Sequence, residues 1–170
     1  FISNNKIVAF HRGRTEIGPR ALCHRSILAN PTNRNMKDIL NNRVKHREPF
    51  RPFAPAVIEE EQYEYFDLKT NSDYMLLATT VKEEHQNNLS SIVHVDNTAR
   101  VQTVSKTTNE FFHRFLTVLK QHIGYPIILN TSFNVAGEPI VETPLDALNT
   151  FLTTNIDVLI IGNYVVEKHN

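Results

Sequence analysis

The early part of the chain carries arginine side chains on a glycine-containing stretch that suits recognition of an anion. Residues 13–26 include Arg14, Arg20 and Arg25, with Gly13 and Gly18 between them. Glycines let backbone N–H groups approach phosphate oxygens, and a guanidinium can form two parallel hydrogen bonds with a phosphate or carboxylate. The stretch therefore predicts a polyanion site. The alternative is a loop with separate surface charges, which rarely act together.

A second group of cations follows within residues 42–55. Lys45, Arg47 and Arg51 are joined there by three prolines in eight residues. Proline restricts the backbone, so less conformational entropy is lost when the cations are held in register. Cations also favour the C-terminal end of a helix, and this alternative accounts for Lys45 but not for Arg47 or Arg51 beyond the helix. We therefore expect a preorganised site.

Polar residues recur at every second position between residues 92 and 102. On extended backbone they would share one face, provided that the turn-forming pair Asp96-Asn97 keeps the alternation. This set is His94, Asp96, Thr98, Arg100 and Gln102. Such a face can bind a metal-nucleotide, a ribose or a carbonyl group, although a His-x-Asp pair without a third ligand is weak evidence for a metal. The alternative is a strand surface that faces solvent.

Neutral polar side chains follow a buried-looking strand at residues 126–129. They are Asn130, Thr131, Ser132 and Asn134, with Gly137 shortly after them. Amides and hydroxyls at a strand end can orient a nucleotide or an activated acyl group at the edge of a sheet. The alternative is local turn and capping chemistry, which needs only one or two of these side chains.

The distribution of charge supports an anionic ligand. The chain has 170 residues and no net charge, but residues 1–51 hold 11 of the 18 basic side chains against three acids, a local net charge of +8. The remaining residues carry −8, so whole-chain charge conceals a strong local field. Eight of the 11 cations are arginine, the residue best suited to bidentate recognition of phosphate and carboxylate.

Composition limits the class of protein. With 41% hydrophobic and 21% charged residues, the chain is ordinary globular protein and can enclose one core. No apolar run approaches the roughly 20 residues of a membrane span. A single cysteine, Cys23, forms no internal disulfide, so a reducing compartment and hence the cytoplasm are expected. Residue 1 lies close to an expected strand without a preceding Met, which favours a fragment of a longer chain.

The elements that must position these side chains alternate between strand and helix. Apolar patterning and turn residues predict a mixed sheet of the α/β or α+β class. Strands are expected at residues 6–10, 25–29, 74–81, 92–102 and 126–129, at the segment closing at Val57 and Ile58, and in a C-terminal hairpin about Gly162-Asn163. Helices are expected at residues 36–45, 59–66, 107–124 and 143–152, with a loop over residues 82–91.

Several details of the helices follow from spacing. Tyr63 and Phe66 should face inward from the helix over residues 59–66. Thr107 or Thr108 should cap the next helix, and Gly124 should end it. In the helix that Thr143 and Pro144 open, the inward residues should be Leu145, Leu148, Phe151 and Leu152.

Two common phosphate-binding signatures are absent from the sequence. It contains neither a Gly-x-x-x-x-Gly-Lys-Ser/Thr loop nor a Gly-x-Gly-x-x-Gly fingerprint. Arginines near Cys23 can lower the pKa of a thiol, but no arrangement of His, Asp or Asn in the sequence marks Cys23 as a nucleophile. We therefore do not expect a catalytic thiol.

The four polar segments, in this order, resemble the C-terminal domain of the nodulation protein U, cephamycin and tobramycin O-carbamoyltransferase family. The resemblance runs from about residue 7 to residue 168. The most specific of the shared sequence motifs are Gly-Arg-Thr-Glu-Ile-Gly-Pro-Arg-Ala-Leu, Phe-Arg-Pro-Phe-Ala-Pro-Ala-Val, His-Val-Asp-Asn-Thr-Ala-Arg-Val-Gln and Asn-Thr-Ser-Phe-Asn-Val-Ala-Gly-Glu-Pro-Ile. Four long motifs in the same order make a chance resemblance negligible.

This resemblance implies a fold, a reaction and partners. The fold would be a single YrdC-like domain over residues 1–170, an open twisted mixed sheet with helices packed on it. The domain would use ATP and Mg²⁺ to convert carbamoyl phosphate into carbamoyl adenylate. An N-terminal domain of the actin-like ATPase type, which contains iron, would then transfer the carbamoyl group to a substrate hydroxyl. No membrane or nucleic acid is expected as a partner.

The resemblance also implies roles for individual residues. The triphosphate and the carbamoyl anion repel each other, so the cations would supply fixed positive charge that holds the two reactants together. Catalytic roles would fall to Arg20, Arg25, Lys45, Arg47, Arg51, His94 and Arg100. The nucleotide or the carbamoyl amide would be held by Asn130, Thr131, Ser132 and Asn134. Asp96 would be the metal partner, although the sequence leaves open whether its segment binds metal or orients substrate.

The chain departs from the family pattern at a few positions. The family usually has Gly-Asn where this chain has Cys23-His24, Gly where it has Asn97, and a longer side chain where it has Ala136. Asn tolerates left-handed backbone, whereas Cys23 and His24 are bulkier and could narrow the pocket. Two other functions stay open at this point: an RNA-binding module of the same fold, and a non-catalytic scaffold domain.

Overall fold

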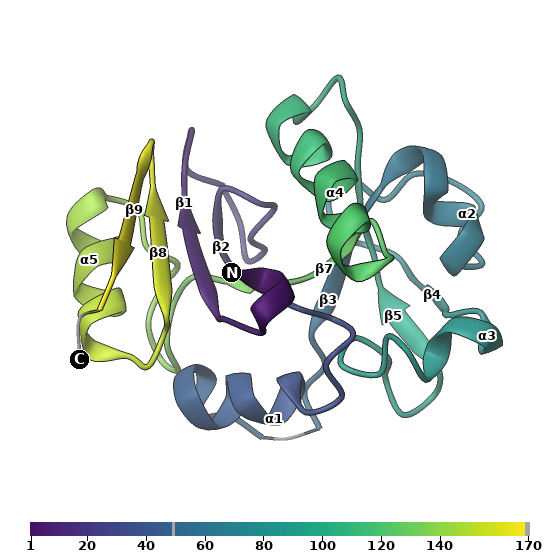
Figure 1. The fold of residues 1–170 in the computed structure, drawn as a ribbon, viewed down its shortest axis with the longest axis horizontal. Helices are drawn as coiled ribbons and strands as arrows, with labels where there is room; N and C mark the ends of the chain where they lie inside the picture. Colours follow the sequence, from purple (N-terminus) through teal and green to yellow (C-terminus); the bar gives the residue numbers. More distant parts are fainter. Residues whose placement is uncertain (49, 169–170) are drawn as a thin grey trace.

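The computed structural model describes residues 1–48 and 50–168, and its main element is a seven-stranded sheet (Figure 1). The strand order is β6-β3-β7-β2-β1-β8-β9. The strands are β1 (Val8–His11), β2 (Arg25–Ala29), β3 (Ala54–Ile58), β6 (Gln102–Val104), β7 (Ile127–Ser132), β8 (Val158–Ile161) and β9 (Tyr164–Glu167). Two neighbouring pairs, β1 with β8 and β3 with β6, are parallel, and the other four are antiparallel. This open mixed sheet confirms the predicted fold class.

Helices and a smaller sheet surround the strands. The helices are α1 (Met36–Leu40), α2 (Gln62–Tyr65), α3 (Glu83–Gln86), α4 (Glu110–Ile123) and α5 (Pro144–Thr153). Three further turns are the 3-10 helices η1 (Ile2–Asn4) and η3 (Glu59–Glu61) and the π-helical turn η2 (Asn41–Lys45), which continues α1. Strands β4 (Ala78–Thr80) and β5 (Thr98–Arg100) pair with each other, beside α2 and α3 on the right of Figure 1.

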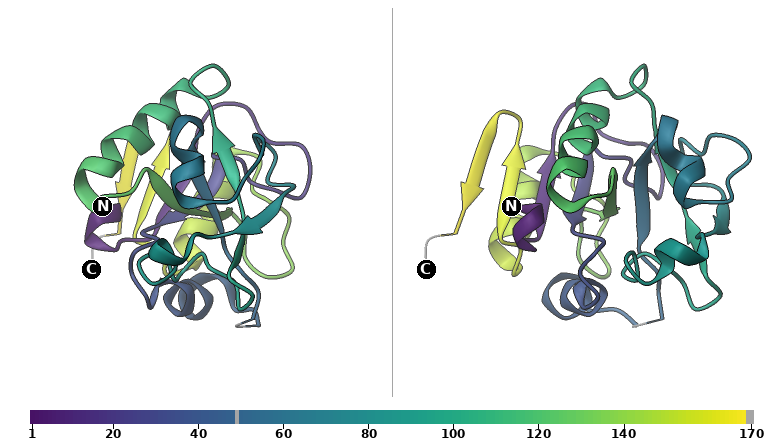
Figure 2. Two further views of the ribbon diagram at one scale, coloured as in Figure 1. Left: turned by 90° about the vertical axis from the view of Figure 1, so that its right-hand side faces the viewer. Right: turned by 45° about the vertical axis from the view of Figure 1, so that its right-hand side comes forward.

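The core has two layers because successive side chains of a strand point to opposite faces of the sheet. On one face, Val8 and Phe10 pack with Phe112 and Leu116 of α4. On the other, the core includes Ile7, which precedes β1, and side chains of β1, α1 and α5, among them Ala9, Met36, Leu40 and Phe151. Figure 2 shows α4 and α1 on different sides of the strands. Burial on both faces makes the central strands rigid supports for the residues at their ends.

The capping residues confirm most of the predicted helix ends. Gly124 ends α4 with φ of 82°, a left-handed conformation that favours glycine. Thr143 forms a reciprocal capping box with Asp146 at the start of α5. The prediction of Thr107 or Thr108 as the cap of α4 is wrong: Asn109 Oδ1 accepts from Phe112 N at 3.1 Å. Both threonine hydroxyls instead lie 2.9 Å from Ser105 Oγ.

Some inward-facing residues were predicted on the wrong side of their helices. Tyr63 is exposed, whereas Tyr65 is buried, because α2 has only four residues and turns a different face to the core. Leu145 and Leu152 are also exposed. The buried face of α5 is formed by Ala147, Thr150 and Phe151, so the helix turns a narrow stripe toward the sheet.

The middle of the chain contains less strand than expected. Only Ala78–Thr80 of residues 74–81 forms a strand, since the partner β5 has only three residues. The Asp96-Asn97 turn does not join two strands, because residues 92–97 are irregular and β6 belongs to the large sheet. The expected loop over residues 82–91 contains the short helix α3. Within the described residues, every helix is too short or too polar to cross a membrane.

Candidate anion-binding site

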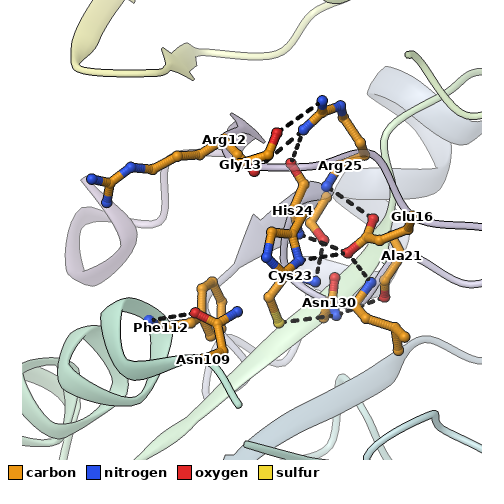
Figure 3. A network of polar contacts seen from close by, with 12 residues as sticks. Arg12, Gly13, Glu16, Ala21, Cys23, His24, Arg25, Asn109, Phe112 and Asn130 are labelled. Atoms are coloured by element: carbon orange, nitrogen blue, oxygen red, sulfur yellow. Dashed lines mark hydrogen bonds and ion pairs between the residues drawn. The ribbon is translucent and has the colours of Figure 1, made fainter. Parts of the chain in front are cut away.

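The loop between β1 and β2 is held from inside by the carboxylate of Glu16 (Figure 3). Glu16 Oε1 accepts from the backbone nitrogens of Leu22 at 2.6 Å and His24 at 2.8 Å, and Oε2 accepts from Arg25 N at 3.0 Å. Its side chain is only 7% exposed. Hydrogen bonds from backbone N–H groups to a carboxylate are among the stronger ones in proteins. One acid therefore fixes the path of the loop that carries Arg20.

Arg25 braces the same loop. Its guanidinium donates to the carbonyl oxygens of Arg12 at 3.3 Å, Gly13 at 3.2 Å and His24 at 3.1 Å, and its Nε donates to Glu142 O at 3.2 Å. Figure 3 shows this group directed toward Arg12 and Gly13. Burial, opposed by nearby acids, lowers the pKa of Arg25. The structure thus places Arg25 in a positioning arrangement, with its donors occupied by the protein.

Cations from three separate segments meet around two adjoining hollows. The smaller, of about 70 Å³, is lined by Arg20, Arg47 and Arg100 together with Asn130, Thr131 and Ser132. The larger, of about 560 Å³, is lined by Lys45, Arg47 and Arg51 together with Ser132 and Asn134. Arg47 and Ser132 border both hollows. Arg20 and Arg47, far apart in sequence, therefore share one concavity, as the sequence predicted.

Lys45 lies at the end of the turn η2 and reaches the polar segment after β7. It is 4% exposed, and its Nζ donates to Ser132 O at 2.5 Å, Asn134 O at 3.0 Å and Asn134 Oδ1 at 2.9 Å. Ser132 Oγ donates to Asn134 Oδ1 at 2.7 Å. Burial in the first place, and then the charge of Arg47, lower the pKa of Lys45 to about 7. Lys45 thus orders a segment of neutral donors and acceptors at the floor of the larger hollow.

Arg47 is the arginine that borders both hollows. Its guanidinium carbon lies 4.6 Å from the centre of the Phe53 ring, and its Nη2 donates to Pro52 O at 3.3 Å. Stacking on an aromatic ring holds the planar guanidinium in one orientation. Arg51 lies nearer the rim: its side chain is 55% exposed, and it pairs with Glu48 at 2.9 Å. Pro49, one of the three expected stiffening prolines, lies outside the described residues.

The cations are close enough to disfavour one another. After burial, the charges of Arg51 and Arg100 lower the pKa of Arg47, and the charge of Arg20 lowers the pKa of Arg100. The repulsion between these neighbouring positive charges costs free energy, and a bound anion would offset that cost. The arrangement can therefore bind a polyanion and stabilise negative charge that develops in a reaction.

The predicted residues on the turn before β5 are only partly brought into this site. Arg100 lines the smaller hollow, but the His94 side chain belongs to the turn, where Nδ1 lies 3.2 Å from Thr98 Oγ1. Burial lowers the pKa of His94, with Arg100 contributing. Asp96 is exposed, and its Oδ1 accepts from Thr98 Oγ1 at 2.7 Å. In residues 1–48 and 50–168, no group of three acid, His or Cys side chains is placed to hold a metal.

The departures from the family pattern have structural counterparts. Cys23 has φ of 75° and Asn97 has φ of 63°, so glycine, the residue that the resemblance implies at both positions, would fit the backbone without strain. Cys23 is buried and its thiol pKa is raised well above its ordinary value, chiefly by burial. Ala136 lines the larger hollow.

Sequence reasoning missed the residues that hold the site from beneath. Glu16 and Phe53 both lie in the motifs that carry the family resemblance, but neither was given a role. Phe53 is 2% exposed and lies under Arg47. The signal for Glu16 is present in the sequence, since it is the one acid among the arginines of residues 12–25. For Phe53, the preceding Pro52 and the following Ala54 and Pro55 indicate a buried strand start.

The lowered pKa of Lys45 predicts a specific pH dependence of stability. Between about pH 7 and the unfolded-state pKa near 10.4, the unfolded chain holds one more proton on this group than the folded chain, so stability should rise with pH by up to about 1.4 kcal/mol per pH unit. Lys45→Met removes this contribution. The stability of the variant minus that of the native chain should be greatest near pH 6.5 and should decrease toward about pH 9. Thermal unfolding at a series of pH values measures this difference.

Lys69→Met is a matched control, because Lys69 is exposed. It should follow the native chain at every pH. Parallel curves for Lys45→Met and the native chain would contradict the assignment of a titrating amine in the floor of the hollow.

Comparison with known proteins agrees with this architecture. The family model described as Carbamoyltransferase C-terminus matches residues 1–168. The nodulation protein NolNO of Sinorhizobium fredii (strain NBRC 101917 / NGR234) is 43% identical over 171 residues, which cover 99% of this chain and 25% of that protein. The 3'-hydroxymethylcephem-O-carbamoyltransferase of Amycolatopsis lactamdurans is 36% identical over 162 residues, which cover 95% of this chain and 31% of that enzyme. The chain thus spans about a quarter to a third of these relatives.

A solved structure has the same fold. The crystal structure of full-length HypF in the phosphate- and nucleotide-bound form superposes with a TM-score of 0.66 at 23% identity, covering 95% of this chain and 24% of HypF. At this identity, the likeness concerns the arrangement of strands and helices. The sequence match over almost the whole length, supported by this shared fold, shows that the chain belongs to the carbamoyltransferase C-terminus family.

Proposed function

We propose that this chain activates carbamoyl phosphate with ATP to form carbamoyl adenylate. The observation that carries the proposal is the meeting of five cations, Arg20, Lys45, Arg47, Arg51 and Arg100, around two adjoining hollows whose remaining lining includes neutral amides and hydroxyls. Membership of the carbamoyltransferase C-terminus family and the phosphate and nucleotide named for the HypF structure support this choice of ligands.

The proposed reaction has a definite atom balance. A carbamoyl oxygen attacks the α-phosphorus of ATP, the bond between the α-phosphorus and the bridging oxygen breaks, and pyrophosphate leaves. For that oxygen to become free, the C–O–P linkage of carbamoyl phosphate must first be cleaved by water, which releases inorganic phosphate. The products are therefore carbamoyl adenylate, one phosphate and one pyrophosphate per cycle.

The residues divide this task by position. Arg47 borders both hollows, so it can contact the phosphates of one ligand and the carbamoyl group of the other. Arg20 and Arg100 flank the smaller hollow, while Lys45 holds the segment of Ser132 and Asn134. Fixed charges in a partly buried site stabilise developing negative charge without reorganisation, and removing one such donor typically costs 10²- to 10³-fold in rate.

The described residues do not provide a built magnesium site. Mg²⁺ bound in nucleotide sites generally takes one or two carboxylates together with phosphate oxygens and water. Asp96 is a single exposed carboxylate engaged by Thr98, and it does not line either hollow. We therefore assign Asp96 to the conformation of its turn, and no step of the proposed reaction depends on it.

The relatives suggest the place of this reaction in a longer protein. Because the chain covers only a quarter to a third of the relatives described above, we propose that it is one domain of a carbamoyltransferase. Another domain, N-terminal to it, would transfer the carbamoyl group to a hydroxyl. The acceptor would contact that domain, since the hollows described here suit the activation step.

A direct test is an assay of the purified chain with ATP, magnesium and carbamoyl phosphate. The expected result is release of pyrophosphate and phosphate in equal amounts, with pyrophosphate absent when carbamoyl phosphate is omitted. Calorimetric binding of ATP that is lost in Arg47→Ala would support the same site. Binding of a short RNA that weakens steeply with salt, without pyrophosphate release, would instead favour a nucleic-acid module.

A further inference from the structure

Three residues that line the smaller hollow carry buried polar atoms, donors and an acceptor, that lack a partner. Among the described residues, Arg47 Nε, Arg100 Nε and Asn130 Oδ1 are buried atoms without a hydrogen-bond partner, and all three residues line this hollow. Two of these atoms are donors and one is an acceptor. A buried polar atom without a partner is costly, and such groups in folded proteins usually have a functional explanation. The hollow therefore suits a ligand that both accepts and donates hydrogen bonds.

The neighbours of Asn130 determine which end of its amide is free. Its Nδ2 donates to Ala21 O at 3.0 Å and to Gln102 Oε1 at 2.9 Å, and lies 3.5 Å from Cys23 Sγ. A backbone carbonyl oxygen can only accept, so the nitrogen of the amide must face Ala21. Figure 3 shows Asn130 beside Ala21 and Cys23. The network thus leaves Oδ1 as the available acceptor of a residue that is 1% exposed.

The size of the hollow limits its occupant. Its volume of about 70 Å³ suits a planar group of a few heavy atoms better than an adenine ring or a triphosphate. A carbamoyl group has this size, and it carries an oxygen that accepts and an NH₂ that donates. The larger hollow, which Arg47 and Ser132 also border, remains for the nucleotide.

We infer that Asn130 reads the amide of the carbamoyl group: Oδ1 accepts from the carbamoyl NH₂, while Arg47 and Arg100 donate to its oxygen. This inference rests on the proposed function and adds a determinant of specificity to it. An acyl phosphate with a methyl group in place of the NH₂ would leave Oδ1 buried without a partner. Sites built to hydrogen-bond a substrate group reject analogues that lack it.

The experiment compares carbamoyl phosphate with acetyl phosphate, which differs in this one group. Dissociation constants for both are measured by calorimetry on the native chain, Asn130→Ala and Cys23→Ala. The native chain should prefer carbamoyl phosphate by about 10-fold or more. Asn130→Ala should bring the ratio close to one, mainly through weaker carbamoyl phosphate binding. Cys23→Ala, which removes the sulfur beside Nδ2 but leaves Oδ1 in place, should keep the native preference.

A second variant guards against a folding defect. Asn130→Val removes the same acceptor but suits the strand β7, and it should lose the preference as Asn130→Ala does. The inference is overturned if the native chain binds both compounds equally, or if a folded Asn130 variant keeps the preference. Pyrophosphate release without a preference would leave the proposed function intact and overturn only this inference. A preference for carbamoyl phosphate without pyrophosphate release would overturn the proposed function and leave the recognition of the carbamoyl group by Asn130 intact.

Discussion

Arg47→Ala is expected to lower ATP-dependent pyrophosphate release by about 100-fold or more. Among the described cations, Arg47 alone lines both hollows, and its planar group is held by Phe53 and by the carbonyl of Pro52. Removing it leaves the two anionic reactants without the charge that lies between them. The rate of pyrophosphate release, measured with saturating ATP and carbamoyl phosphate, tests this expectation.

Two further variants separate charge from geometry. Arg47→Lys keeps the charge but loses the planar fork, so its rate should fall between those of the native chain and Arg47→Ala. Arg34→Ala removes an exposed cation of the same basic third and should change the rate by less than about twofold. A similar small effect of Arg47→Ala in a folded chain would place the reaction elsewhere.

Glu16→Ala is expected to cause the largest loss of stability, roughly 3 to 5 kcal/mol. The substitution leaves three partly buried backbone N–H groups, those of Leu22, His24 and Arg25, without their acceptor, at about 1 to 3 kcal/mol each before water enters. For a domain of this size, the midpoint of thermal unfolding should fall by about 10 °C or more.

Two comparisons check the reason for this loss. Glu16→Gln keeps one acceptor oxygen but turns an NH₂ toward backbone donors, so it should be destabilised less than Glu16→Ala. Glu84→Ala removes an exposed acid and should remain within about 0.5 kcal/mol of the native chain. If Glu16→Ala unfolds at the native temperature, the carboxylate does not hold the loop.

The sequence predicted some of the residues of the candidate site but not the role of each, because the role depends on which partner a side chain finds in the folded protein. Arg20, Lys45, Arg47, Arg51 and Arg100 were all named from sequence, and all line one of the hollows. Arg25 was named for the same role, yet its donors are occupied by carbonyl groups of the loop. Residue type predicts what a side chain can bind but not which partner, protein or ligand, will occupy it.

The metal and turn assignments were limited in another way. The alternation from His94 to Gln102 assumed continuous extended backbone, but the chain is irregular before β5 and changes sheet after it. Asp96 consequently lies exposed and does not line the smaller hollow, which Arg100 does. Alternation of polar and apolar residues shows which side chains share a face only where the strand is continuous. In a strand of three residues, the alternation is too short to show where the strand begins and ends.

By itself, the sequence determined the mixed sheet, the helix end at Gly124, the capping at Thr143 and the basic character of residues 1–51, because these depend on local backbone preference and on composition. Only the tertiary structure decided which cations share a hollow, since the register of β2, β7 and β3 brings distant segments side by side. It also decided that Glu16 and Arg25 face the protein while Arg47 borders both hollows. Such choices depend on which hydrogen-bond partners surround each side chain in the folded protein, and residue type alone does not encode them.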